Sequence, residues 1–148
     1  MKKRQFLKDA DPAAFDVLLG FERYLAKSPL DRKHAHLIKI RVSQLNGCSY
    51  CIDKHIDEAL KAGEDPRRIF VLAVWHDTPF FSDAERALLA LVEEITTVYK
   101  HGVSDAAYDR AIQILGQEYT TATMMAAIAM NAWNRVGITT GREPQLIR

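Results

Sequence analysis

The chain has 148 residues, of which 48% are hydrophobic, and its 20 basic and 19 acidic side chains leave a formal net charge of +1. This length and apolar content predict a single domain, residues 1–148, with one core. A near-neutral balance provides no broad attraction to nucleic acid or to an anionic membrane, so neither is expected as a partner.

The start of the chain is basic, but charges at Lys8 and Asp9 interrupt it before an apolar stretch develops, which argues against a signal peptide. The longest uncharged stretch, residues 119–134, contains threonines, asparagines and many alanines and is a poor candidate for a membrane span. We therefore predict a cytoplasmic protein. In that compartment a CxxC pair is more often catalytic, redox-active or metal-binding than structural, because thiol buffers keep ordinary disulfides reduced.

Helix start and stop signals follow one another along the chain, and no segment alternates with the period of a strand. Asp11, Asp31, Asp65 and Ser104 stand where helix caps are expected, and Ser82 begins an S-x-x-E capping box. The pattern predicts an all-α fold of about six or seven helices. The expected helices are residues 12–28, 32–46, 48–62, 66–75, 83–101, 105–115 and 120–136, with a loop at 76–81.

The last of these helices is apolar or small on nearly every side, since ATMMAAIAMNAW (residues 122–133) carries no charge. Such a helix is buried, either at the centre of the domain or against another subunit. Because so few short helices leave little room for complete burial, the pattern favours a homo-oligomer. The helix is expected to end at Gly137, and the last ten residues are expected to form a loose tail.

The stretch NGCSYCIDKH, residues 46–55, contains both cysteines of the chain and one histidine. On a helix, Cys48, Cys51 and His55 fall within an arc of about 60° on one face. The i,i+4 spacing of Cys51 and His55 places a nucleophile beside a base. A helix N-terminus favours a thiolate and lowers its pKa, and a second thiol can close a disulfide after oxidation of the first.

The residues alone leave other interpretations of this motif open. Both cysteines could be small buried hydrophobes beside a surface histidine. Cys48, Cys51 and His55 could bind zinc, with His34, His36 or His76 as a fourth ligand, although three ligands on one rigid helix converge poorly on a tetrahedral ion. The pair could also be a redox sensor or disulfide exchanger without peroxidase turnover.

Three stretches together resemble the alkylhydroperoxidase AhpD family within the carboxymuconolactone decarboxylase superfamily. They are IRVSQLNGCSYCIDKHIDEALKAGED (residues 40–65), RRIFVLAVWHDTPFFSDAERALLALVEEIT (67–96) and MNAWNR (130–135). The resemblance covers about residues 15–136, the expected core of the domain. It implies an AhpD-like, compact all-helical domain that assembles as a homo-oligomer, often a trimer or hexamer. It also implies reduction of a small hydroperoxide without a cofactor or metal, with recycling by a lipoyl-bearing or thioredoxin-like dithiol protein.

Matched position by position, Cys51 takes the place of the cysteine that attacks the peroxide. Cys48 takes that of the resolving cysteine, and His55 that of the histidine in the proton relay. Where family members carry a glutamate twelve residues before the first cysteine, this chain has His36. A carboxylate beside His55 would hold its tautomer and raise its basicity, so His36 is a candidate substitute if it accepts a hydrogen bond from His55 or from a bridging water.

The favoured function is therefore a thiol-dependent alkyl hydroperoxide reductase with catalytic residues Cys51, Cys48, His55 and His36. One alternative is a decarboxylase-type lyase acting on a small lactone acid, in which the cysteines would be idle. Another is a non-enzymatic redox or stress-response module, which the missing relay carboxylate would favour.

Overall fold

The computed structural model describes residues 4–144, and these contain nine α-helices, one 3-10 helix and no strand. The predicted all-α fold class is confirmed. The helices, in chain order, are α1 Leu7–Ala10, α2 Pro12–Leu25, α3 Arg32–Asn46, α4 Ser49–Lys61, α5 Pro66–Val71, the 3-10 helix η1 Leu72–Asp77, α6 Asp83–Thr96, α7 Val98–His101, α8 Asp105–Leu115 and α9 Gln117–Thr139.

The predicted caps form. Asp11, Asp31, Asp65 and Ser104 each accept hydrogen bonds from the first backbone N–H groups of the helix that follows. The S-x-x-E motif closes as a reciprocal capping box in which Ser82 accepts from the backbone of Glu85 and the Glu85 carboxylate accepts from the backbone of Ser82. These local bonds explain why the starts of the helices after these five residues were predictable. Helix α9, whose N-cap Gly116 forms no side-chain cap, begins at Gln117 and not at the expected residue 120.

The helix boundaries differ from expectation in several other places. Helix α2 ends at Leu25, before the expected residue 28. The single turns α1 and α7 are additional, so the helix after Ser82 ends at Thr96, before α7. The helix after Asp65 continues beyond Val71 as a 3-10 helix with a kink at Val74. The last helix passes through Gly137 to Thr139, and Gly137 packs closely against Cys48 and Cys51.

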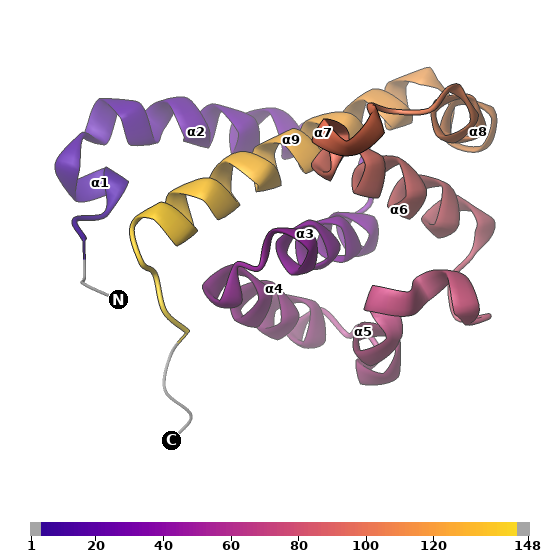
Figure 1. The fold of residues 1–148 in the computed structure, drawn as a ribbon, viewed down its shortest axis with the longest axis horizontal. Helices are drawn as coiled ribbons and strands as arrows, with labels where there is room; N and C mark the ends of the chain where they lie inside the picture. The colour runs from indigo at the N-terminus through magenta and orange to yellow at the C-terminus, as the bar shows by residue number, and fades with distance from the viewer. Residues whose placement is uncertain (1–3, 145–148) are drawn as a thin grey trace.

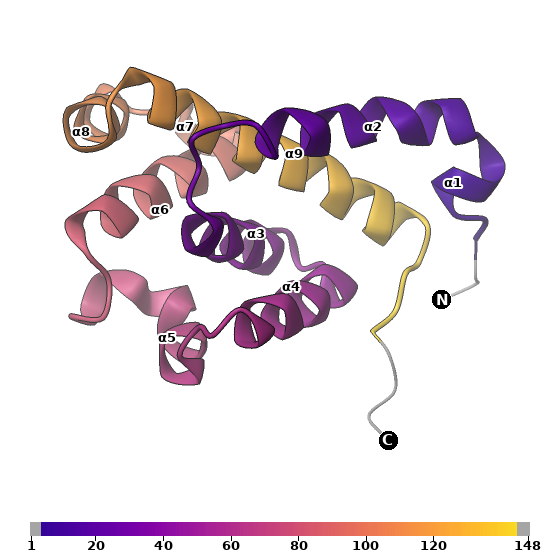
Figure 2. The same cartoon turned by 180° about the vertical axis from the view of Figure 1, so that it is seen from behind.

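Helices α3 and α9 form the centre of the molecule. Helix α3 packs against α4, α6 and α9, and α9 packs against α2, α3, α6 and α8. Figure 1 shows α9 running between α2 on one side and α3 and α6 on the other, while α1 and α2 extend beyond the rest of the bundle. Seen from behind in Figure 2, the described parts of both chain ends lie at this same end, beyond the start of α4.

Burial of α9 occurs within the single chain. Its buried side chains include Ala122, Thr123, Ala126, Ala127 and Met130, which face the neighbouring helices of the same domain. The central-helix alternative therefore accounts for its apolar sequence, and α9 supplies no argument for a subunit interface. Helix α2, in contrast, contains no fully buried residue despite its apolar composition. Oligomerisation stays a prediction.

Across residues 4–144 no helix is both long enough and apolar enough to cross a membrane.

Candidate active site

The turn between α3 and α4 sets the position of the CxxC motif. Gly47 ends α3 in the left-handed conformation, with φ of 69°, which a residue with a side chain adopts at a cost. Asn46, just before it, donates hydrogen bonds from Nδ2 to Oδ1 of Asn131 and Oδ1 of Asn134 on α9. The Nδ2 group of the fully buried Asn134 in turn donates to Oγ of Ser43. This amide network ties the turn to the central helix.

Cys48 is the N-cap residue of α4, and its Sγ accepts a hydrogen bond from the backbone N–H of Cys51 at 3.3 Å. The two cysteines form a disulfide, and both are almost fully buried. The structure thus brings together the two sulfurs that the motif placed on one helix face.

Gly137 on α9 lies directly against this disulfide. A Cβ atom on Gly137 would be 3.3 Å from Sγ of Cys48 and 3.4 Å from Sγ of Cys51. Only a residue without a side chain lets α9 approach the sulfurs this closely, so Gly137 is part of the wall of the site.

His55 lies one turn after Cys51 and is 7% exposed. Its Nδ1 is 2.8 Å from Oε2 of Glu58, one further turn along α4. Burial alone would raise the pKa of Glu58, but the hydrogen bond and charge of His55, with Lys54 and Lys39, hold that pKa below its ordinary value. An ionised carboxylate only accepts hydrogen bonds, so Nδ1 of His55 carries the proton and Nε2 has the free lone pair.

The pKa of His55 lies below its ordinary value, chiefly because burial disfavours the charged imidazolium. The hydrogen bond and charge of Glu58 act in the opposite direction, and the nearby Lys39 and Lys54 lower the pKa further. At neutral pH, His55 is therefore a neutral base.

A cavity of about 420 Å³ opens onto Cys51 and His55. Cys51, but not Cys48, is among its lining residues. Helices α2, α3, α4 and α9 form its walls together with the described ends of the chain. The lining residues are Phe6, Phe15, Leu19, Glu22, Lys39, Tyr50, Cys51, Lys54, His55, Glu58, Met130, Trp133, Val136, Gly137 and Arg142.

Aromatic rings form one wall of this cavity. Phe6 packs edge-on against Phe15, and Phe15 packs edge-on against Trp133, with ring centroids 5.8 Å and 5.5 Å apart. The indole N–H of Trp133 donates to the carboxylate of Glu22 at 2.9 Å. These contacts hold the exposed helix α2 over the disulfide region.

The expected loose tail is ordered as far as Arg142. Its guanidinium lies over the rings of Phe6 and Tyr50, at 4.4 Å and 4.7 Å from their centroids, and donates to Oη of Tyr50. Its backbone N–H donates to the carbonyl of Gly137. The remainder of the predicted tail, residues 145–148, lies outside the described residues.

His36 is buried, but it does not lie among the cavity-lining residues. Neither of its ring nitrogens has a hydrogen-bond partner in the described chain, so the direct bond to His55 that was considered for it is not formed. Burial, followed by the charge of Lys39, lowers its pKa, while Glu58 acts to raise it. A role through a bridging water stays a prediction.

Sequence reasoning passed over three residues of this site. Glu58 stands three residues after His55, and side chains at this spacing are neighbours on a helix. That spacing could have identified Glu58 as the hydrogen-bond partner of His55. Gly137 and Arg142 carried no such signal, because their contacts join segments far apart in the chain.

The residues considered as zinc ligands do not form a cluster. In residues 4–144 there is no group of three or more histidine, cysteine or acidic side chains arranged to hold a metal ion. The two sulfurs are bonded to each other, His34 contacts the hydroxyl of Tyr119, and His76 stacks on Trp75.

The all-helical bundle and its CxxC site agree with the comparison to known sequences. The sequence profile of the carboxymuconolactone decarboxylase family matches residues 12–94. The chain belongs to this family and has the fold of its AhpD-like members.

Among its relatives, the uncharacterized protein YdfG of Bacillus subtilis (strain 168) is 36% identical over 141 residues, which cover 95% of this chain and 96% of YdfG. A crystal structure of a protein of unknown function from Agrobacterium tumefaciens, suggested to be an antioxidant defence protein AhpD, is 31% identical. It has a TM-score of 0.94 and covers 99% of this chain and 100% of its own. The debrominase Bmp8 has the same fold, with a TM-score of 0.82 at 17% identity, covering 92% of this chain and 73% of Bmp8.

Proposed function

We propose that the protein is a thiol-dependent reductase of organic hydroperoxides. The observation that carries this proposal is that Cys51, one half of a disulfide with Cys48, lines a cavity beside the paired His55 and Glu58. A reversible sulfur pair open to a cavity, with a neutral base on the same helix, is suited to two-electron reduction of a small molecule.

In the reduced enzyme, His55 takes the proton of the Cys51 thiol at Nε2. The Cys51 thiolate attacks the distal oxygen of the hydroperoxide, a sulfur–oxygen bond forms, and the oxygen–oxygen bond breaks. The products are a sulfenic acid on Cys51 and an alkoxide, which receives the proton from His55 and leaves as the alcohol. Glu58 positions the imidazole and stabilises its charged form during the transfer.

In the second step the Cys48 thiol attacks the Cys51 sulfenic acid, and water leaves as the disulfide forms. A dithiol donor then reduces the disulfide and is itself oxidised. A lipoyl-bearing or thioredoxin-like protein is the partner class that we propose, in a protein that acts as a homo-oligomer in the cytoplasm. No metal or cofactor takes part in these steps.

The N-cap position favours a thiolate at Cys48, because its sulfur accepts the N–H of Cys51. Access favours Cys51, because Cys51 lines the cavity and Cys48 does not. We assign the attack to Cys51, since a thiolate that the peroxide cannot reach does not react. The N-cap thiolate of Cys48 then serves the attack on the sulfenic acid.

Two other functions make different predictions. A lyase acting on a lactone acid would keep its activity without either cysteine. A redox module would form the disulfide but would not turn over. The aromatic wall of the cavity also fits a halogenated aromatic ring, whose reductive dehalogenation would consume the same two thiols. Bmp8, which shares the fold, is named a debrominase.

The test is a stoichiometric oxidation. The reduced protein is mixed with one equivalent of cumene hydroperoxide, and the remaining thiols and the alcohol formed are measured. In a separate reaction the reduced protein is mixed with a bromopyrrole, and released bromide is measured. We expect loss of two thiols for each alcohol formed, and continued turnover when a dithiol donor is added. Retained thiols with unreacted peroxide would contradict the proposal, and bromide release alone would support dehalogenation.

A further inference from the structure

The charged groups that line the cavity are unevenly paired. Lys39 lies 3.8 Å from the carboxylate of Glu22, and Lys54 lies 3.7 Å from that of Glu58. Arg142 is the remaining cation of the lining, and within residues 4–144 it makes no ion pair. Because His55 is neutral, the cavity carries a positive charge that its own carboxylates do not balance.

Arg142 is held in a defined orientation. Its guanidinium contacts the rings of Phe6 and Tyr50, and one of its N–H groups donates a hydrogen bond to the Tyr50 hydroxyl at 3.0 Å. A guanidinium has five N–H donors in a planar fork that matches a carboxylate. The remaining donors lie beside Tyr50, the cavity-lining residue that immediately precedes Cys51.

The rest of the cavity is large and partly apolar. Hydrogen peroxide occupies about 60 Å³ if each oxygen takes the space of one liquid water. The cavity, at about 420 Å³, is in the range of sites for organic ligands. Phe6, Phe15, Leu19, Met130 and Trp133 provide the apolar wall on which a carbon chain or ring can lie.

We propose that the substrate is an organic hydroperoxide with an apolar body and a carboxylate, and that Arg142 binds this carboxylate. A peroxidised fatty acid has this chemistry. The carboxylate at Arg142 and the carbon chain on the aromatic wall would leave the peroxide group to reach Cys51. This assignment rests on the proposed function, because it names the substrate of the same site.

The test compares a medium-chain hydroperoxy fatty acid with its methyl ester, which differ only in the charge. For the native protein we expect kcat/KM to favour the acid by about fivefold, mainly through KM, as an exposed ion pair allows. Arg142→Gln should bring the acid-to-ester ratio close to one, and Arg142→Lys should keep part of the preference. Added salt should reduce the preference of the native protein.

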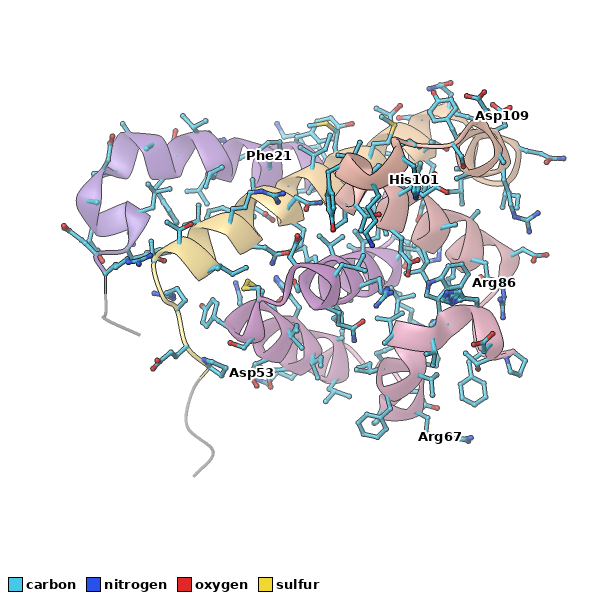
Figure 3. All side chains as sticks on the ribbon, in the orientation of Figure 1. Phe21, Asp53, Arg67, Arg86, His101 and Asp109 are labelled. Carbon is cyan, nitrogen blue, oxygen red and sulfur yellow. A yellow bond between two sulfur atoms is a disulfide. The ribbon has the colours of Figure 1, made fainter. Side chains whose placement is uncertain are left out.

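Arg67→Gln is the matched control. Arg67 is also an exposed arginine stacked on a phenylalanine, with its guanidinium 5.0 Å from the centroid of Phe80. It belongs to α5, on the side of the molecule away from the described chain ends (Figure 3). This variant should keep the acid preference. An equal loss of preference in Arg67→Gln and Arg142→Gln would overturn the assignment, as would a native acid-to-ester ratio of one.

A binding measurement separates this inference from the proposed function. The stable hydroxy fatty acid and its methyl ester are titrated into the disulfide form by calorimetry. Tighter binding of the acid, lost in Arg142→Gln, with no peroxide turnover would keep the carboxylate site and reject the reductase. Reduction of neutral cumene hydroperoxide with equal binding of acid and ester would keep the reductase and reject the carboxylate site.

Discussion

Gly137 lies so close to Cys48 that a methyl group on Gly137 would be 3.3 Å from the Cys48 sulfur. Gly137→Ala should therefore destabilise the protein by about 1 kcal/mol, because overpacking against both sulfurs outweighs the gain in helix propensity. Urea unfolding of the oxidised protein measures the change. Gly20→Ala on α2 is the matched control, since its methyl group would meet only the Arg23 side chain at 3.8 Å, and it should stabilise the protein.

Replacement of Glu58 should affect the chemistry more than the fold. Glu58→Gln removes the charge that raises the pKa of His55, so the acid limb of the pH–rate profile should move to lower pH. The weaker base should also lower the maximal rate by about tenfold. Asp57→Asn is the control, because within residues 4–144 the exposed Asp57 pairs only with Lys61, and this variant should keep the native profile. An unchanged profile in Glu58→Gln would remove Glu58 from the mechanism.

Stability should decrease as the pH falls below about 6.5, the ordinary pKa of histidine. The pKa values of His36 and His55 are both lowered by burial, so between the folded and unfolded pKa values the unfolded chain binds more protons. Each histidine adds a slope of at most about 1.4 kcal/mol per pH unit. Urea unfolding between neutral and mildly acid pH measures it.

His36→Leu should flatten that slope and stabilise the protein, because the ring nitrogens of His36 have no partner in residues 4–144. Peroxide reduction should continue in this variant if Glu58 alone supports His55. A large loss of rate, with His55 still titrating in NMR, would instead place His36 in the proton relay through water.

The buried amide network should contribute strongly to stability. Asn134→Leu removes the acceptor of Asn46 and the donor to Ser43, and we expect a loss of about 2–3 kcal/mol in the free energy of unfolding. Thr121→Val is the control on the same helix. In the described part of the chain the exposed Thr121 donates only to the carbonyl of Gln117, and its replacement should change stability by less than about 0.5 kcal/mol. Equal effects would reject the network as a stabilising element.

Prediction from sequence succeeded where a few neighbouring residues determine the outcome. Asp31 and Ser82 cap helices through bonds to residues two or three positions away, and the CxxC spacing brings the sulfurs together on one helix. It failed at Gly137, which was expected to end the last helix but lies inside it, against the sulfur pair at the start of another helix. Burial of α9 was equally undecided, since the same apolar sequence suits a central helix or an interface.

The site itself was partly predictable for the same reason. Cys51 and His55 lie near each other through helix geometry alone, and Glu58 follows from the next turn of the same helix. Arg142 reaches Phe6 and Tyr50 only because the two ends of the chain meet over the cavity. No local sequence pattern predicts a contact between segments so far apart in the chain.

The assignment of peroxide attack to Cys51 and of disulfide formation to Cys48 is tested most directly by single-cysteine variants. Reduced Cys48→Ser and Cys51→Ser are mixed with one equivalent of cumene hydroperoxide, and the oxidation state of each remaining sulfur is measured by mass spectrometry. We predict a trapped sulfenic acid on Cys51 in Cys48→Ser and an unoxidised Cys48 in Cys51→Ser. A sulfenic acid on Cys48, or peroxide reduction that survives the loss of Cys51, would contradict the account.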